Sequence, residues 1–457
     1  MRARALAAAV AFLTLTPAAA EEITFGEALA RVHGANESMQ AASEAVSARR
    51  EERAATFGLY YPQFDASARY TKMNAPLVMD LSPIRDVILQ LNPNVPPALV
   101  PPFVETIQKE KFWLADVTLT WPVFTGGKID AANRAAEARV KDAVQEGKAT
   151  EEELTVELAS RYFGLRLALR VRDVRKQVLD ALDTHLYQAR RLEDEGVIAR
   201  AERLHAEVAR AEGQRELKRS EHDVALARTA LANTLATSDE TLDPASPLFL
   251  LKGVEPLDNF VCRAQAGNPL LGRVAAQQEL ASDSLRSEHA RFFPDVYLFG
   301  RQELHKADLT ILDPEWAIGV GAKITLFDGF ERAHRVAAAK DRQKQLGYVE
   351  QKARRDVGTL VEERFRELQK AKDQFDSLEA TVALADESLR VRTRAFEEGL
   401  ATSLEVVDAR LALSKVELER LAAAYEFDVD LAELLSACGE TLRFEEYRTR
   451  ADVEVER

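Results

Sequence analysis

The strongest constraint on the fold of this chain is an internal duplication, because four sequence landmarks occur twice in the same order. They are an asparagine (Asn36 and Asn268), an aromatic pair followed by proline (Tyr60-Tyr61-Pro62 and Phe292-Phe293-Pro294), a Phe-x-Gly triplet (Phe124-Thr125-Gly126 and Phe327-Asp328-Gly329) and a Glu-Gly pair (Glu195-Gly196 and Glu398-Gly399). The first two landmarks recur at one offset (268 − 36 = 294 − 62 = 232) and the last two at another (327 − 124 = 399 − 196 = 203). Two constant offsets predict a chain built from two tandem structural repeats.

The difference between the two offsets locates an insertion between the proline and Phe-x-Gly landmarks of the first copy. Prolines gather in the first part of this stretch, at Pro76, Pro83, Pro93, Pro96, Pro97, Pro101 and Pro102. Proline interrupts helix interiors and central strands. We therefore interpret the stretch as a loop insertion.

The first 20 residues have the pattern of a secretory signal peptide. A basic start with Arg2 and Arg4 precedes an apolar run from Ala5 to Leu15 and an Ala-x-Ala site at Ala18-Ala19-Ala20. The apolar run is too short to span a membrane, and the alternative is a buried N-terminal helix. Removal of the peptide would change the net charge from −14 to about −16. So acidic a chain is a poor partner for nucleic acid.

Two tracts without proline predict long helices. They extend from Val123 to Asp243 and from Glu315 to the C-terminus, and both are rich in the strongest helix-forming residues. Apolar residues at steps of three and four form two adjoining stripes, which indicates helices with neighbours on more than one side. A helix from Lys128 to Gly196 would be ~100 Å long. Gly196 and Gly399 lie where a left-handed residue would end one helix and reverse the chain.

Beside the proline and Phe-x-Gly landmarks, the period of apolar residues changes from near 3.6 to 2. Four such segments begin near Phe64, Trp113, Val296 and Trp316, and each has about ten residues. Outer-membrane strands have this length and alternation, with aromatic residues at the interfaces. We assign Trp113, Trp121 and Trp316 to such an aromatic belt. A half-buried strand of a soluble sheet would show the same alternation.

Four strands are too few to close a barrel, because the smallest known membrane barrels have eight. An open sheet edge in hydrocarbon leaves backbone groups unpaired, at a cost of several kcal/mol for each group. If these hairpins enter a bilayer, several copies of the chain must share one barrel.

These signals predict a division of the chain into a signal peptide (1–20), a first repeat (21–236), a linker (237–259), a second repeat (260–439) and a C-terminal tail (440–457). The first repeat is expected to contain strands over about 62–72 and 112–122, a long helix over about 127–195 and a return helix over about 198–236. The second repeat is expected to contain strands over about 294–304 and 315–327, a long helix over about 330–398 and a return helix over about 401–437.

From Ile23 to about Gly439, the chain resembles the TolC family of outer-membrane channel proteins. The most specific elements are the two landmarks beside the strands and the helix tips, Glu195-Gly-Val-Ile-Ala-Arg-Ala-Glu202 and Glu398-Gly-Leu-Ala-Thr-Ser-Leu-Glu405. The resemblance implies a mainly α-helical chain with membrane β-strands. It further implies a homotrimer in which four strands per chain form a 12-stranded outer-membrane β-barrel that continues into a periplasmic α-helical tunnel.

The resemblance also implies a function. The channel would be the passive exit duct of a tripartite efflux pump or a type I secretion system, located in the outer-membrane lipid of a Gram-negative bacterium. It would work with a periplasmic adaptor (membrane fusion protein) and an inner-membrane transporter of the RND, ABC or MFS class. Adaptor docking is implied at the helix tips, at Gly196, Val197, Gly399 and Leu400. The alternative is a periplasmic coiled-coil adaptor or scaffold, and the sequence does not identify a substrate.

Members of the family close the periplasmic end by coiling the inner helix pair of the second repeat inward. Just past that tip, inward carboxylates ring the constriction and favour cations. The matching positions are Glu405 and Asp408, which share a helix face, and Glu202 is the counterpart of Glu405 in the first repeat. The alternative is a solvated charged face. The chain has Ala401 where some members have a locking arginine, and Phe396 lacks the hydroxyl of the matching aromatic. We therefore expect a different closing network.

Motifs for catalysis and for tight metal binding are absent from the sequence. There is no His-Glu-x-x-His, phosphate-binding glycine loop, Gly-x-Ser-x-Gly or Cys-x-x-Cys. Glu202-x-x-His205 resembles half of a di-iron site, which requires two such pairs. We expect no enzymatic activity, cofactor or metal. Cys262 and Cys438 would form one disulfide or remain two buried thiols.

Overall fold

The computed structural model describes residues 22–237, 241–310 and 312–455, so the expected signal peptide lies outside the described residues. The chain forms two compact units. The helical unit contains the residues up to Val46, Asp142–Val274 and the residues from Val349 onward. The sheet unit contains Ser47–Lys141 and Ala275–Tyr348.

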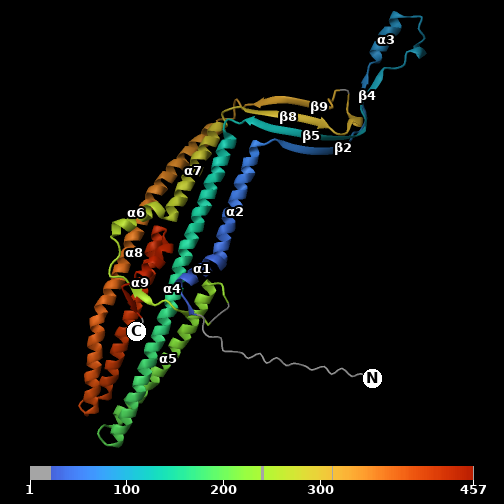
Figure 1. The fold of residues 1–457 in the computed structure, drawn as a ribbon. Coiled ribbons are helices and arrows are strands. Elements are labelled where there is room, and N and C mark those ends of the chain that lie inside the picture. The colour runs from blue at the N-terminus through green and yellow to red at the C-terminus, as the bar shows by residue number, and fades with distance from the viewer. Residues whose placement is uncertain (1–21, 238–240, 311, 456–457) are drawn as a thin grey trace, which may run out of the picture. The chain divides into compact units, whose positions relative to one another are not determined.

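Two long helical hairpins provide most of the helical unit (Figure 1). In each hairpin a long helix is followed by a shorter return helix: α4 (Lys128–Asp194) by α5 (Arg200–Thr234), and α8 (Glu331–Glu397) by α9 (Ser403–Cys438). Helices α4 and α8 each have 67 residues, and both ends of α8 lie at the same offset from α4 as the later landmarks (331 − 128 = 397 − 194 = 203). The duplication found in the sequence is therefore present in the structure. The observed bounds of both long helices differ from the expected bounds by one residue at each end.

Each repeated asparagine lies between two consecutive helices. These helices are α1 (Phe25–Ala35) and α2 (Glu37–Phe57), then α6 (Leu257–Gly267) and α7 (Pro269–Ala290). The Asn36 side-chain oxygen accepts a hydrogen bond from the Ser38 amide (2.9 Å), and its side-chain amide donates to the Thr234 carbonyl at the end of α5 (3.1 Å). Asn268 makes the same two bonds, the second with Ala437 in α9. This landmark caps one helix and satisfies a carbonyl at the end of another.

The linker pairs with both ends of the described chain. Strand β1 (Glu22–Ile23) pairs in parallel with β6 (Asp243–Pro244), and β10 (Val453–Val455) pairs antiparallel with β7 (Leu248–Leu250). The segment expected as a C-terminal tail is thus part of the helical unit wherever it is described. We refer to these strands and the residues packed on them as the belt.

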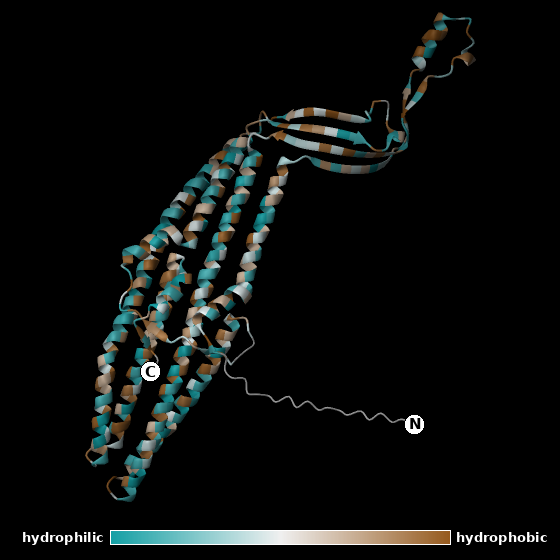
Figure 2. Cartoon of the chain, viewed as in Figure 1, coloured by the Kyte–Doolittle hydropathy of each residue, from teal (hydrophilic) through white to brown (hydrophobic). Residues whose placement is uncertain are grey.

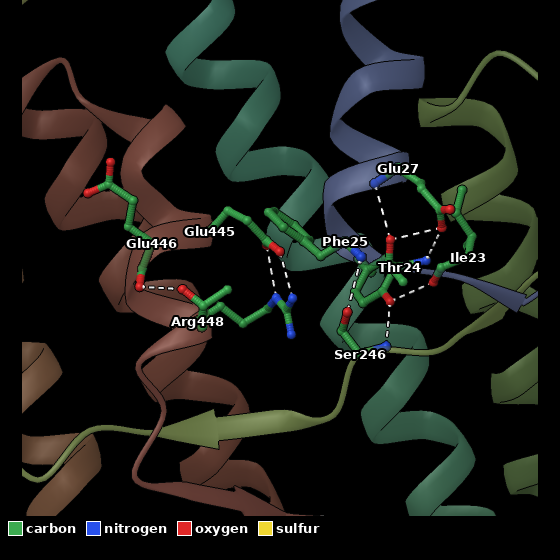
Figure 3. Close-up of polar contacts among 10 residues, drawn as sticks. Ile23, Thr24, Phe25, Glu27, Ser246, Glu445, Glu446 and Arg448 are labelled. Atoms are coloured by element: carbon green, nitrogen blue, oxygen red, sulfur yellow. Dashed lines mark hydrogen bonds and ion pairs between the residues drawn. The ribbon is translucent and has the colours of Figure 1, made fainter.

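Hydrogen bonds that begin α1 also hold the belt together (Figure 3). The Thr24 hydroxyl accepts from the Glu27 amide (3.3 Å), and the Glu27 carboxylate accepts from the Thr24 amide (2.9 Å). The Phe25 amide donates to the Ser246 hydroxyl (3.1 Å), and the Ser246 amide donates to the Tyr162 hydroxyl (2.8 Å). The start of α1, helix α4 and the linker therefore share one buried polar network.

The largest apolar core of the helical unit lies beneath the belt. The turn η4 (Thr441–Arg443) and helix α10 (Phe444–Thr449) place the Phe444 ring against the rings of Phe25 and Phe163, with centroid distances of 4.9 and 5.8 Å. All three phenylalanines are fully buried. Burial of one such side chain stabilises the fold by about 1.5–3 kcal/mol, so the C-terminal segment contributes to stability.

Four strands form one antiparallel sheet in the sheet unit (Figure 1). In spatial order they are β2 (Gln63–Lys72), β5 (Lys111–Phe124), β8 (Asp295–Glu303) and β9 (Trp316–Lys323). The single turns η1 (Gly58–Tyr60) and η3 (Lys306–Asp308) flank these strands in the sequence. Among the described strands, none pairs with the outer edge of β2 or of β9. The sheet therefore ends in two open edges.

The register places the three tryptophans on one face of the sheet. Residues directly opposite one another share a face. Trp316 lies opposite Gln302, which lies opposite Val117, and Val117 has the same parity along β5 as Trp113 and Trp121. The other face carries most of the polar and charged residues, including Asp65, Ser67, Arg69, Asp116, Thr118, Thr120, Arg301 and Glu303. Figure 2 shows this alternation along the strands.

The Phe-x-Gly landmark of the first repeat packs against the aromatic landmark of the second repeat. Gly126 has a φ of +62°, a left-handed conformation that favours glycine. A Cβ atom at this position would lie 2.6 Å from the Phe293 Cβ and 2.7 Å from the Ala290 carbonyl oxygen. Only a glycine fits this close approach.

The prediction that the insertion is a loop is wrong in part. Strands β3 (Leu77–Asp80) and β4 (Val104–Gln108) pair with each other, and α3 (Ser82–Leu91) and the turn η2 (Pro97–Leu99) lie between them. Pro83 occupies the first turn of α3, where the missing N–H costs no helical hydrogen bond. The many prolines of the insertion therefore did not prevent helix α3 from forming.

The two cysteines are both free. Cys438 is buried and its thiol donates to the Phe260 carbonyl (3.4 Å), and burial raises the pKa of the Cys438 thiol to about 12. Cys262 is exposed. The two residues form no disulfide, and of the two thiols only Cys438 is buried.

Candidate gate and docking site at the helix tips

Both hairpins reverse direction through the same turn. Gly196 and Gly399 follow the long helices with φ values of 75° and 73°. At the first tip the Val197 amide donates to the Leu192 carbonyl (2.8 Å), and the second tip has the equivalent bond (2.7 Å). This pattern satisfies carbonyls at a helix end and requires a left-handed residue. The reversal predicted at both glycines is confirmed.

The return helices begin differently. Helix α9 begins with a capping box, in which the Thr402 hydroxyl accepts from the Glu405 amide (3.3 Å) and the Glu405 carboxylate accepts from the Thr402 amide (3.4 Å). The counterpart of Thr402 is Ala199, which provides no side-chain cap to α5. Only the second return helix caps itself.

Glu202 extends from α5 to the start of α9. Its carboxylate accepts a hydrogen bond from the Ser403 amide at 2.7 Å. Ser403 is the first residue of α9 and is fully buried. A carboxylate at a helix N-terminus satisfies a free amide and interacts favourably with the helix dipole. Glu202 therefore joins the two hairpins.

His185 reinforces this junction from α4. Its Nε2 lies 2.7 Å from the Ser403 hydroxyl oxygen, and its ring lies 4.7 Å from the Phe396 ring. Burial lowers the pKa of His185, and the negative charge of Glu202 opposes this effect. The imidazole is therefore held in its neutral form near pH 7. We call His185, Glu202 and Ser403 the tip junction.

Apolar side chains from all four long helices pack beneath the tip junction. Phe396 is fully buried at the centre of this cluster. The remaining buried members are Leu186, Ala189, Ala206, Leu389, Val406 and Leu413. Phe396, which was assigned to the gate, is therefore a core residue of the tip within one chain.

The two carboxylates assigned to a cation ring have different surroundings. Glu405 forms an ion pair with Arg392 of α8 in addition to its capping bonds. Asp408, one turn further along α9, is exposed. A single chain does not place carboxylates of neighbouring copies together, so the ring of Glu405 and Asp408 stays a prediction.

The residues assigned to adaptor docking expose apolar surface. The side chains of Val197 and Leu400, at the two turns, are 53% and 78% exposed. A cavity of about 250 Å³ lies between α5 and α9, against α4, and its apolar lining comprises Val178, Val208, Ala209, Leu404, Val407 and Leu411. Large exposed apolar side chains that gather at one site are typical of interaction surfaces.

The three tryptophans lie near the two opposite ends of the strands. Trp113 and Trp316 lie near the end at which β5 and β9 begin, and Trp121 lies near the end at which β5 leads toward α4. Eight residues separate Trp113 from Trp121, which is ~27 Å along a strand. The apolar band of an outer-membrane barrel has a similar height of about 25 Å, with aromatic residues at both margins.

Comparison with known proteins identifies the family of this chain. The family model described as outer membrane efflux protein matches residues 28–237 and 261–440, which is more than half of the chain. The chain belongs to the outer membrane efflux protein family. The resemblance to TolC-type channels is therefore confirmed, together with the expected location in the outer membrane. The family consists of channel proteins.

Individual relatives support this assignment. Protein CyaE of Bordetella pertussis is 24% identical over 341 residues, which cover 71% of this chain and 70% of CyaE. The solved structure of CusC matches with a TM-score of 0.76 and 15% identity, and covers 91% of this chain and 92% of that chain. The open-state MtrE channel of Neisseria gonorrhoeae matches with a TM-score of 0.72 and 18% identity, over 92% of this chain and 89% of that chain. The fold expected for efflux proteins is thereby confirmed.

None of the described helices combines the length and the apolar character needed to cross a membrane.

Several residues of the tips were not found from the sequence. His185 and Ser403 are 218 residues apart and belong to no motif. Arg392 lies 13 residues before Glu405, on the opposite arm of the hairpin. The fold alone brings these groups together. The sequence offered one signal for these contacts, the constant offset between the repeats, which makes Glu202 the counterpart of Glu405.

Proposed function

We propose that three copies of this chain form the passive exit duct of a tripartite efflux pump or a type I secretion system. The duct would receive substrate from an inner-membrane transporter of the RND, ABC or MFS class through a periplasmic adaptor. Membership of the outer membrane efflux protein family supports the role in export. Energy would come from the transporter.

The observation that carries the proposal is the sheet with one apolar face and two open edges. An edge strand in hydrocarbon needs a partner, because unpaired amides and carbonyls there cost several kcal/mol each. Pairing of β2 in one copy with β9 in the next satisfies both edges and closes a ring. Three copies contribute 12 strands, an even number within the range of known barrels. In this ring the tryptophan face would contact lipid and the polar face would line the lumen.

The helix tips supply the proposed periplasmic gate and docking surface. In the closed state Glu405 and Asp408 of three copies would surround the lumen and favour cations. The exposed apolar side chains of Val197 and Leu400 support docking of the adaptor at the tips. The cavity between α5 and α9 would accept an apolar side chain of the adaptor.

Fractionation and conductance test this proposal. The protein should require detergent for extraction from the outer membrane, behave as a trimer in detergent and form ion-conducting pores in planar bilayers. A folded single subunit that is released by washing would instead support a periplasmic adaptor or scaffold.

A further inference from the structure

The segment between β2 and β5 carries an interaction surface that the proposed function does not use. We call residues 73–110 the excursion. It contains β3, α3, η2 and β4, and it extends away from the end of the sheet at which β2 finishes and β5 begins (Figure 1). The corresponding connection in the second repeat is the short segment between β8 and β9.

Internal hydrogen bonds hold the excursion in a defined conformation. The Arg85 guanidinium of α3 donates to the carbonyls of Val100 (2.8 Å) and Pro97 (3.1 Å). These bonds attach the returning chain to one side of α3. The excursion is therefore a preorganised element, although none of its residues is fully buried.

The base of the excursion is attached to the second repeat. Lys109 forms an ion pair with Asp308 (2.8 Å), and the Trp113 amide donates to the same carboxylate (2.9 Å). These two interactions lower the pKa of Asp308 to about 2. Arg85 and Lys109, the two basic residues of the excursion, thus both bind groups within the same chain.

The remaining side of α3 is an unpartnered apolar stripe (Figure 2). Residues at steps of three and four share a helix face, and this face consists of Ile84, Val87, Ile88 and Leu91. Their side chains are 53%, 52%, 36% and 76% exposed. Such a stripe in an ordered helix indicates a missing contact.

Two observations identify a second copy of the chain as the partner. The excursion continues directly from β2, the edge strand that must pair with a neighbouring copy in the proposed ring, so it begins at the contact between copies. The excursion is also acidic. It has four carboxylates, Asp80, Asp86, Glu105 and Glu110, and only two basic residues, both of which already bind within the chain. This charge disfavours contact with anionic lipid headgroups.

We propose that the α3 stripes of three copies pack against one another and constrict the outer mouth of the channel. The inference rests on the proposed trimer. Three short helices around a common axis would each bury Ile84, Ile88 and Leu91 against the other two. The polar sides of the helices, with Asp86, would remain in water.

Disulfide trapping tests the contact between copies. Full-length protein with Ile88→Cys, in a Cys262→Ser background that removes the exposed thiol, is oxidised with copper phenanthroline in outer membranes. Cys438 remains but is buried. The one accessible cysteine per chain should link two of the three copies, so denatured samples should show dimers and remaining monomers. The matched control is Asp86→Cys on the opposite side of α3, which should form dimers several-fold more slowly.

The outcomes separate this inference from the proposed function. If the detergent-extracted protein is trimeric but Ile88→Cys forms dimers no faster than Asp86→Cys, the packing of α3 against α3 of other copies is refuted. The proposed function as an exit duct would be unaffected by this result. If the protein is not trimeric, the proposed function itself is refuted. A fluorophore on Ile88→Cys that is quenched by brominated acyl chains would show that lipid covers the stripe, and would also refute the packing.

Conductance provides a second measurement. The double variant Ile88→Asp and Leu91→Asp should raise single-channel conductance and leave the trimer intact, because repulsion would separate the three helices. The control Asp86→Asn should leave conductance unchanged. Equal conductance of the double variant and the parent protein would refute a constriction at this mouth.

Discussion

The two hairpin tips have the same backbone but are stabilised in opposite ways. In the first tip, Glu193 and Arg203 form an ion pair between α4 and α5 (2.5 Å). The equivalent positions of the second tip are Phe396 and Val406, which are both buried in the apolar cluster. The first tip therefore has a partly buried ion pair at positions where the second tip has buried apolar side chains.

The tips also differ in what they require from each other. At the start of α9, the Ser403 amide donates to the Glu202 carboxylate and the Ser403 hydroxyl shares a hydrogen bond with His185; both partners belong to the first hairpin. Helix α5 is preceded by Ala199, which provides no side-chain cap. The comparison indicates that the second tip depends on the first. A movement of α8 and α9 away from the first hairpin must break the tip junction, so this junction is a candidate for the closing network.

The largest difference between the tips should appear when equivalent positions are truncated. Phe396→Ala removes a fully buried ring and should destabilise the second tip by about 3–5 kcal/mol. Glu193→Ala, at the equivalent position of the first tip, breaks a partly exposed ion pair and should cost about 0–1 kcal/mol. Hydrogen exchange of the tip amides in the detergent-solubilised trimer measures both effects. Equal effects would contradict the proposed difference between a buried ring in the second tip and an ion pair in the first.

Removal of the bond between the hairpins should have the next largest effect. Glu202→Ala leaves the Ser403 amide without its acceptor and should cost about 1–3 kcal/mol at the start of α9. Glu202→Gln keeps an acceptor oxygen without the charge and should lie between the parent protein and the alanine variant. If the junction closes the gate, Glu202→Ala should also increase the open fraction in planar bilayers. An unchanged open fraction would limit Glu202 to a structural role.

The repeats were predictable from the sequence because they depend on local signals. Proline-free tracts, the turn glycines and the alternation along strands predicted the long helices and the sheet, with small errors in the bounds. The constant offsets further predicted that Asn36 and Asn268 have equivalent roles. The structure shows what the role is, since each asparagine bonds to the end of a return helix.

The tip junction and the excursion were not predictable for different reasons. Glu202 and Ser403 are 201 residues apart, and only the antiparallel packing of two hairpins brings them together. In the excursion, many prolines hid a ten-residue helix because Pro83 occupies the first turn. Glu405 was assigned correctly to a tip, but its ion pair with Arg392 depends on the geometry of the hairpin.

The pH dependence of stability should differ in sign between the second tip and the belt. Burial lowers the pKa of His185 below its ordinary value of 6.5. The unfolded tip therefore binds more protons below pH 6.5, and the folded tip loses stability as the pH falls through that range. Burial raises the pKa of Glu152, which accepts from the Thr441 amide, from 4.5 to about 7. The belt should therefore gain stability as the pH falls from about 7 to 4.5.

Hydrogen exchange at about pH 7.5 and about pH 5.5, corrected for intrinsic rates, checks both signs. Protection of the α9 start should decrease on acidification, and protection around Thr441 should increase. His185→Gln should abolish the change at the tip and leave the belt unaffected. A tip response that persists in His185→Gln would exclude His185 as its source.

The smallest expected effect concerns the charge of the second tip. The variant Glu405→Ala with Asp408→Ala should reduce cation preference, measured as the reversal potential in a salt gradient across a planar bilayer. Since Arg392 is paired with Glu405, the exposed Asp408 should contribute more than Glu405, and Arg392→Ala should increase cation preference. Glu398→Ala removes an exposed carboxylate from the same tip and serves as the matched control. Equal reversal potentials for the double variant and this control would place Glu405 and Asp408 on a solvated helix face and would exclude a cation ring at the second tip.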